Sequence, residues 1–211
     1  MRVPSVCLAL LCLSSISYTS TRSLELYRNS RAQIAAPAVR IARQAVTTYL
    51  ETGRAVVEEK GLPEAFRKKA AVFVTISSNG RRRGCAGGFE PAAANLRDEI
   101  VLAAIRAATA DTRYRAVRAG ELDRLTFTVS IVGPLTPVSD PSRYPPAAYG
   151  LLARNGPKSG VILPGEAKTS RWGLSEAKRQ AGIRPDEPCE LYVFETVTLT
   201  ERPGAKDGGR R

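Results

Sequence analysis

The chain has 211 residues and a formal net charge of +12, from 32 Lys and Arg against 20 Asp and Glu, and it contains no histidine. This excludes the Ser–His and Cys–His pairs that activate nucleophiles, and four cysteines alone leave most zinc sites excluded as well. The basic excess favours acidic partners. Because the basic residues are scattered and not gathered on one predicted helix, nucleic acid is the less favoured partner.

Residues 1–21 differ in composition from the rest of the chain. Arg2 precedes an apolar run over residues 6–13, and small polar residues follow. Such a run is too short to span a bilayer permanently but is typical of an export signal. We expect cleavage, a mature chain without a transmembrane span, and a periplasmic or secreted protein; a cytoplasmic protein with a retained N-terminus is the alternative. Cleavage would leave Cys85 and Cys189, which an oxidising compartment would allow to pair.

The first predicted helix spans residues 34–49, where apolar residues recur at spacings of three and four. Pro37 fits its first turn and Gly53 fits the position just past its end. A short helical turn is expected near residues 63–66.

A β-hairpin is the strongest local prediction. Residues 71–77 are rich in β-branched side chains, Asn79-Gly80 is a preferred two-residue turn, and residues 81–86 form the returning strand. A second helix is predicted over residues 91–110.

The second half of the chain alternates strands with turns. A strand is predicted at 125–132, an irregular proline-rich connector at 134–146, and a second hairpin at 150–154 and 160–163 around Asn155-Gly156. A short helix at 174–181 and one long strand at 190–200 complete the pattern, and residues 202–211 form a Gly-rich basic tail expected to be disordered. The fold class is therefore α+β: a mainly antiparallel sheet with helices packed on one face, in one domain over residues 22–201.

The segment Arg83-Gly84-Cys85-Ala86-Gly87 resembles the Leu-Arg-Gly-Cys-Ile-Gly signature of the AMMECR domain family, with Arg82 in place of Leu and Ala86 in place of Ile. Other segments follow in the family's order over about residues 38 to 200: Asp111-Thr112-Arg113-Tyr114, Glu121-Leu122, Val129-Ser130-Ile131, Gly160 to Pro164 with Glu166 and Ala167, Trp172, and Ala181-Gly182. Tyr149-Gly150 stands where the family often has His-Gly, and Gly165 interrupts the family's Pro-Glu step.

This resemblance implies two unequal lobes with a cleft lined by the cysteine motif. Bacterial and archaeal members are called protein A of the AmmeMemoRadiSam system, which implies a Memo-like protein as one possible partner. The family carries no assigned reaction, so whether the chain is an enzyme is left open. The sequence itself has no phosphate loop, dinucleotide fingerprint or metal-ligand cluster, and therefore implies no cofactor and no metal.

Cys85 is the candidate nucleophile, because neighbouring arginines lower a thiol pKa. Arg83 would stabilise the thiolate or hold an acidic ligand, Glu166 or Asp111 would carry a proton, and Gly84 and Gly87 would turn backbone amides toward an anion.

Each of these residues also has a structural interpretation. Cys85 packs well as a small apolar side chain, and the glycines suit a bulge. Asp111 and Arg113 close the end of a helix or form an ion pair lining the cleft. Trp172 is expected to be a core anchor. The sequence thus predicts a domain that binds or modifies a small ligand around Cys85, and the basic neighbours would suit an anionic one. A non-catalytic interaction module is the alternative.

Overall fold

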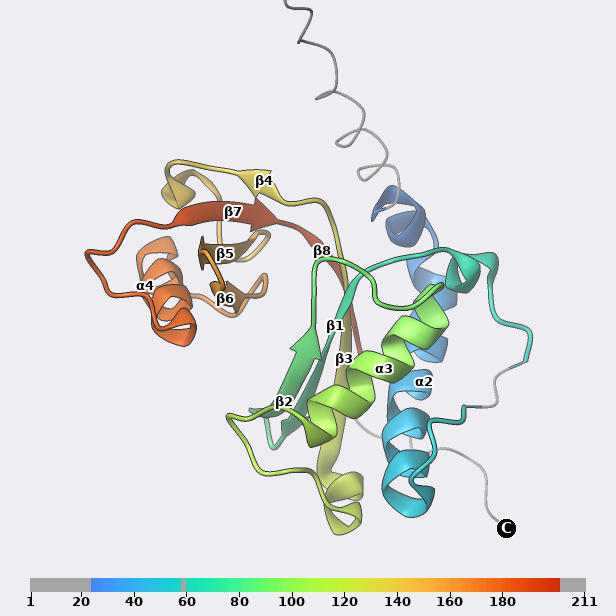
Figure 1. The fold of residues 1–211 in the computed structure, drawn as a ribbon. Coiled ribbons are helices and arrows are strands. Elements are labelled where there is room, and N and C mark those ends of the chain that lie inside the picture. Colours follow the sequence, from blue (N-terminus) through green and yellow to red (C-terminus); the bar gives the residue numbers. More distant parts are fainter. Residues whose placement is uncertain (1–23, 58–59, 202–211) are drawn as a thin grey trace, which may run out of the picture.

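A computed structural model describes residues 24–57 and 60–201, so the expected export signal at 1–21 and the basic tail at 202–211 lie outside the described residues. Figure 1 shows two unequal lobes. The helices and strands of the larger lobe are α2 (Arg31–Thr52), η1 (Glu64–Arg67), β1 (Val72–Ser78), β2 (Arg81–Gly87), α3 (Leu96–Thr109), η2 (Ala119–Arg124), β3 (Leu125–Val132) and β8 (Thr196–Thr200). Those of the smaller lobe are β4 (Thr136–Pro137), η3 (Pro141–Arg143), β5 (Gly150–Asn155), β6 (Lys158–Ile162), α4 (Ser170–Ala181) and β7 (Glu190–Phe194).

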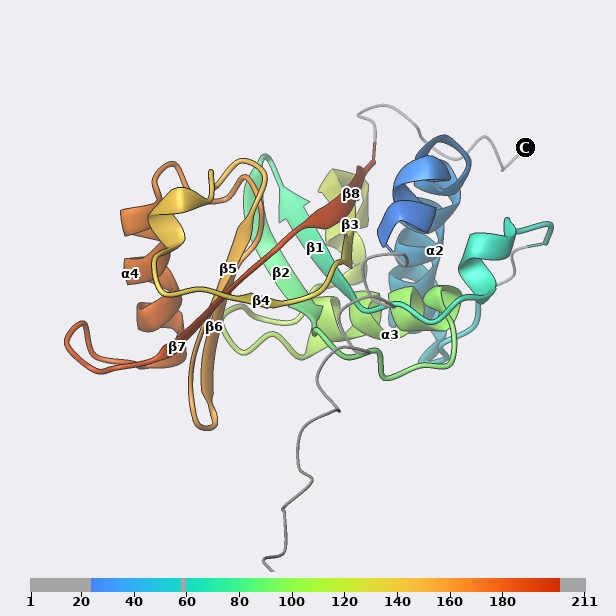
Figure 2. The same cartoon turned by 90° about the horizontal axis from the view of Figure 1, so that it is seen from above.

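Each lobe is built on a four-stranded sheet in which every pair of neighbours is antiparallel. The order is β2-β1-β3-β8 in the larger lobe and β4-β7-β5-β6 in the smaller lobe. Helices α2 and α3 cover the first sheet, and α4 covers β5 and β6 of the second (Figures 1 and 2). The predicted α+β class with antiparallel pairing and two lobes is confirmed, although the strands form two sheets and not one.

The segment at 190–200 is divided between the two sheets, so the prediction of one long strand is wrong. Glu195 separates β7 from β8, and its carbonyl accepts a hydrogen bond from the Gly133 N–H at 2.9 Å. The chain also passes from the larger to the smaller lobe just after β3, and this second connection therefore lies beside the one at Glu195. The period-two pattern runs from Leu191 to Leu199 with Glu195 at one of its positions. Such a pattern cannot reveal that the strand changes partners there.

Two predicted turns and one strand are confirmed closely. Asn79 and Gly80 both have positive φ, as a two-residue hairpin of this type requires. Gly53 ends α2 in the left-handed conformation, and its N–H donates to the Tyr49 carbonyl. Strand β3 has the predicted bounds.

Three helix starts differ from the prediction. Helix α2 begins at Arg31, so Pro37 lies inside the helix and not in its first turn. Helix α3 begins only at Leu96, because the Asn95 side chain caps it by accepting from the Asp98 N–H. Helix α4 begins at Ser170, since Thr169 caps it by accepting from the Trp172 N–H.

Trp172 is not the core anchor that the sequence predicted. It lies in the first turn of α4 and is 51% exposed. Its large side chain was assigned to the core from hydrophobicity alone, but the buried residues of α4 are the small ones, Gly173 and Ala177. No helix among the described residues combines the length and apolarity needed to cross a membrane.

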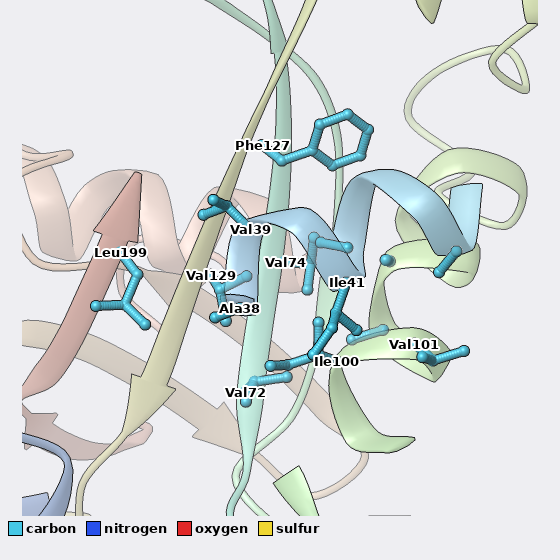
Figure 3. Packing of buried hydrophobic residues seen from close by; sticks show 14 of the residues in the cluster. Ala38, Val39, Ile41, Val72, Val74, Ile100, Val101, Phe127, Val129 and Leu199 are labelled. Carbon is cyan, nitrogen blue, oxygen red and sulfur yellow. The ribbon is translucent and has the colours of Figure 1, made fainter. Parts of the chain in front are cut away.

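The main core lies between the first sheet and its two long helices. Figure 3 shows Ile41 of α2 and Ile100 of α3 meeting Val74 and Val129 of the sheet. A much smaller apolar cluster lies between α4 and the second sheet. Phe73, Leu163 and Phe194 form a third cluster that joins the lobes.

Candidate functional site

A cavity of about 340 Å³ lies between the lobes, within the range typical of small-molecule sites. Its walls come from β2 and the loop after α3 on one side, and from β6, its following loop and α4 on the other. The lining residues are Phe73, Arg82, Cys85, Ala86, Gly87, Thr112, Arg113, Ser159, Gly160, Val161, Leu163, Glu166 and Gln180. We call this cavity the interlobe cleft.

The shape of β2 determines which of its side chains reach the cleft. Ile76 pairs with Gly84 and Ser77 pairs with Arg82, so Arg83 is an extra residue opposite this step, a β-bulge. Gly84 faces α3, where a Cβ would lie only 2.1 Å from the Ala107 carbonyl oxygen. Close helix packing therefore accounts for this glycine, and Gly84 is not among the residues that line the cleft, whereas Cys85 is.

The Cys85 thiol is mostly buried among neutral and charged neighbours. Thr75 donates a hydrogen bond to its sulfur at 3.4 Å. Burial raises the pKa of the Cys85 thiol, and the bond from Thr75 with the charges of Arg82 and Arg113 offsets only part of that effect. The low thiol pKa expected from the arginine neighbours is thus not what the structure supports, because desolvation outweighs them.

Asp111 and Arg113 close the outer edge of β2 at Cys85. An Asp111 carboxylate oxygen accepts from the Cys85 backbone N–H at 2.8 Å, and the Arg113 guanidinium donates to both carboxylate oxygens. The Asp111 side chain is 5% exposed and that of Arg113 is 44% exposed. Burial alone would raise the Asp111 pKa, but the hydrogen bonds from Arg113 and Cys85 outweigh it and lower the pKa. The structure shows the ion pair beside the cleft, and it also shows the turn expected after the helix, because the Asp111 carboxylate accepts from the Arg113 backbone N–H at 3.1 Å.

Arg82 and Glu166 form an ion pair across the cleft. The Arg82 guanidinium donates to one carboxylate oxygen of Glu166, and the Leu163 N–H donates to the other at 3.1 Å. Both side chains are about one quarter exposed, at 25% and 24%. Glu166 is thus held at both oxygens, which fixes the orientation of its carboxylate in the cleft. In the sequence Arg82 was one of the arginines neighbouring Cys85 and a departure from the family signature, but it was not singled out as a ligand-binding residue.

Arg83 is engaged elsewhere. Its guanidinium donates to both carboxylate oxygens of Glu121, at 2.8 and 2.9 Å, and to the carbonyls of Arg115 and Ala116. It is not among the residues that line the cleft. The arginines that line the cleft are Arg82 and Arg113. The bulge separates Arg82 from Arg83, and the run of three arginines in the sequence does not reveal this.

Aromatic rings form the floor where the lobes meet. Phe89 packs edge-to-face against Phe73 at 5.4 Å and Phe194 at 4.9 Å between ring centroids. Gly87 lines the cleft through its backbone, and a Cβ there would lie 2.1 Å from the Val72 carbonyl oxygen. The close approach accounts for the glycine without a ligand.

Two other sequence candidates lie outside the cleft. Tyr149, at the position of the family histidine, packs edge-to-face on Tyr144 beside a cavity of only about 20 Å³. Cys189 is a free thiol near Arg154 and Glu190 in the smaller lobe, and Cys85 is also free. Among residues 24–57 and 60–201, no group of three or more Cys, Asp and Glu side chains is placed to hold a metal ion.

Comparison with known proteins identifies the domain. Residues 39–199 match the family model described as AMMECR1. The chain belongs to the AMMECR1 family. This confirms the family resemblance seen in the sequence, and the matched range includes every residue that lines the interlobe cleft.

Relatives occur in both bacteria and archaea. A protein of Thermotoga maritima is 36% identical over 163 residues, which cover 75% of this chain and 94% of the relative. Protein MK0488 of Methanopyrus kandleri is 35% identical over 180 residues, covering 77% and 86%. The crystal structure of the uncharacterized protein PH0010 from Pyrococcus horikoshii is similar, with a TM-score of 0.70, 29% identity and coverage of 79% and 91%. These names assign no activity, so membership of the AMMECR1 family gives the fold and not a reaction.

Proposed function

We propose that the interlobe cleft binds a small ligand through an anionic group, such as a carboxylate, beside Cys85. The observation that carries the proposal is the pair of guanidinium groups on Arg82 and Arg113. Both line the same cavity as the thiol. Arginine is the side chain best suited to hold a planar anion through parallel N–H donors.

Both guanidinium groups keep N–H donors for a ligand although each has a carboxylate partner. Arg113 bonds Asp111 through Nε and Nη2, and Arg82 bonds Glu166 through Nη2. Within the described part of the chain, Nη1 of Arg113 and Nε and Nη1 of Arg82 form no hydrogen bond. The carboxylates fix the direction of each arginine, so less side-chain freedom is lost when a ligand binds.

Binding is a better-supported role for Cys85 than nucleophilic catalysis. The raised pKa favours the protonated thiol at neutral pH, whereas the thiolate is the nucleophile. Glu166 accepts from Arg82 at one oxygen and from the Leu163 N–H at the other, and within the described residues the hydrogen-bond partner of the Cys85 sulfur is Thr75 and not Glu166. The thiol therefore serves best as a neutral group in contact with the ligand, and as a chemical reporter of what enters the cleft.

Two alkylating reagents of similar size test the proposal. In a Cys189→Ser protein, the rates for anionic iodoacetate and neutral iodoacetamide are compared at Cys85. In each reaction the thiolate sulfur forms a bond to carbon and iodide leaves. If the arginines concentrate anions in the cleft, the ratio of iodoacetate to iodoacetamide rates at Cys85 should exceed that of free N-acetylcysteine by roughly tenfold, and should fall with salt.

Two arginine variants provide the comparison. Arg113→Gln should remove most of the preference for iodoacetate. Arg154→Gln is the matched control, because Arg154 also pairs with a carboxylate, that of Glu190, but lies outside the cleft. A ratio at Cys85 equal to that of N-acetylcysteine, or a preference that survives both Arg113→Gln and Arg82→Gln, would rule the proposal out.

A further inference from the structure

The cleft lies between the free edges of two sheets. Strand β2 ends the first sheet and β6 ends the second, so each has a β partner on one side only. Cys85 and Gly87 of β2 and Ser159 and Val161 of β6 line the cavity. Figure 2 shows the two strands in neighbouring positions, each in its own lobe. An unpaired strand edge is a template for another extended chain.

The edge of β2 is already blocked at Cys85. Its N–H donates to Asp111 at 2.8 Å, and its carbonyl faces an Arg113 N–H at 3.5 Å. These side chains occupy the positions that a neighbouring strand would use. The AMMECR1 domain therefore protects one side of the cleft from strand pairing.

The edge of β6 is open. Asn155 and Lys158 form the hydrogen-bonded pair that closes the tight turn. In an antiparallel pair every second residue bonds to the partner strand, so the next outward-facing residues of β6 are Ser159 and Val161. Their N–H and C=O groups therefore point away from β5. Leu163, two residues after Val161, follows the same alternation, because its N–H donates to Glu166 and not to β5. Among the described residues, no hydrogen bond outside the ladder with β5 reaches the backbone of Ser159 or Val161.

We propose that the interlobe cleft receives the C-terminal end of an extended peptide, which pairs with the β6 edge and places its terminal carboxylate against Arg82 and Arg113. This rests on the anion site proposed above and names its ligand class. The open backbone of Ser159 and Val161 recognises a peptide backbone, whatever its sequence. The free guanidinium donors recognise the terminal carboxylate. In a peptide, only the C-terminal end has a carboxylate directly after the last peptide group.

The walls of the cleft fit such a ligand in size and polarity. Phe73, Val161 and Leu163 form an apolar surface that can accept a side chain. The volume of about 340 Å³ limits entry to the last few residues of a peptide. Asp111 and Glu166 offset part of the two arginine charges, so the directed N–H donors add selectivity to the electrostatic attraction for an anion.

Three forms of one ligand test the proposal without altering the protein. Acetyl-Ala-Val-Leu is prepared as the free acid, as the amide, and as the free acid with the Leu nitrogen methylated. Each is titrated into ¹⁵N-labelled full-length protein and followed by NMR. We expect the free acid to bind roughly tenfold more tightly than either of the others, and to shift the amide signals of Ser159 and Val161.

Acetate separates failure of this inference from failure of the anion site. If acetate shifts the Arg113 signals but the free acid binds no more tightly than the amide or the N-methyl form, the peptide proposal is overturned while the anion site stands. If neither acetate nor the peptide acid shifts these signals, both fail.

A protein variant tests the same contact from the other side. Val161→Pro removes an outward N–H while leaving the ladder with β5, as proline is tolerated on an edge strand. It should reduce binding of the free acid to the level of acetate. The proposal would be contradicted if the Val161→Pro protein bound the free acid as tightly as the native protein does while NMR showed that β5–β6 pairing is intact.

Discussion

In both lobes a glycine on the edge strand lets a helix pack closely against it, but the two lobes bury very different amounts of apolar surface. Gly84 of β2 lets the Ala107 carbonyl of α3 approach, and Gly160 of β6 lets the Ala177 carbonyl of α4 approach; a Cβ would meet these oxygens at 2.1 and 1.9 Å. The main cluster of the larger lobe has 30 buried residues, whereas that of the smaller lobe has 5. The larger lobe should therefore supply most of the stability, and the smaller lobe should open first.

Truncations in the two cores test this difference and should have the largest effects. Phe127→Ala in the larger lobe should lower the free energy of unfolding by about 3–5 kcal/mol, because a fully buried ring is lost. Leu151→Ala in the smaller lobe should cost about 2 kcal/mol, the low end for this change, since few buried neighbours surround it. Urea denaturation measures both, and an equal or larger cost for Leu151→Ala would reverse the proposed ranking.

The paired glycines sharpen the comparison at the edge strands. Gly84→Ala and Gly160→Ala should each cost about 1–3 kcal/mol, because the added methyl group would force a backbone carbonyl to move. Hydrogen exchange should then distinguish the lobes: Gly160→Ala speeds exchange in α4 and β6 alone, and Gly84→Ala speeds it through the larger core.

Gly120→Ala is the matched control for both glycine variants. No atom lies within 4 Å of a Cβ at that position and its φ is not positive, so the substitution should be close to neutral. If Gly160→Ala and Gly84→Ala lowered the free energy of global unfolding equally, the two lobes would unfold as one unit.

Carboxylates in the two lobes should differ in their effect on stability at low pH. The Asp111 pKa lies below its ordinary value in the folded protein. The contribution of Asp111 is therefore fully present above the unfolded pKa of about 3.9 and is lost as the pH falls through the lower folded value. Asp111→Asn should cost about 1–3 kcal/mol at pH 7, and the difference from the native protein should shrink below about pH 4.

Glu176 on α4 provides the contrast and the smallest expected effect. Hydrogen bonds from Arg179 lower the pKa of Glu176 to about 2 despite some desolvation. That arginine lies three residues away on the same helix and is 73% exposed, so the pair should contribute less than about 1 kcal/mol. Thermal unfolding of Asp111→Asn and Glu176→Gln across pH 2–7 measures both. A larger loss for Glu176→Gln would contradict the importance assigned to burial of Asp111.

Local sequence patterns predicted the elements better than their partners. The hairpin at Asn79-Gly80, strand β3 and the end of α2 at Gly53 follow from turn chemistry and alternation, which act over a few residues. Helix starts were missed where a cap such as Asn95 competes with an apolar pattern that continues on both sides.

The candidate site was predicted in part. Cys85, Glu166, Asp111 and Arg113 were named from the sequence and lie in or beside one cleft. Arg82 was missed as a cleft residue, because only the bulge beside Arg83 separates the two arginines. The thiol pKa was misjudged because desolvation depends on burial, which a list of neighbouring charges does not contain.

The sequence by itself determined the family, the antiparallel α+β class and the position of the cysteine motif, since each rests on residues that are close along the chain or in a fixed order. Tertiary structure alone decided that residues 190–200 change sheets at Glu195, and that β2 and β6 end their sheets on opposite sides of one cleft. It also paired Arg82 with Glu166, 84 positions apart. The physical reason is that a strand's alternation records which faces are buried but not which strand lies beside it.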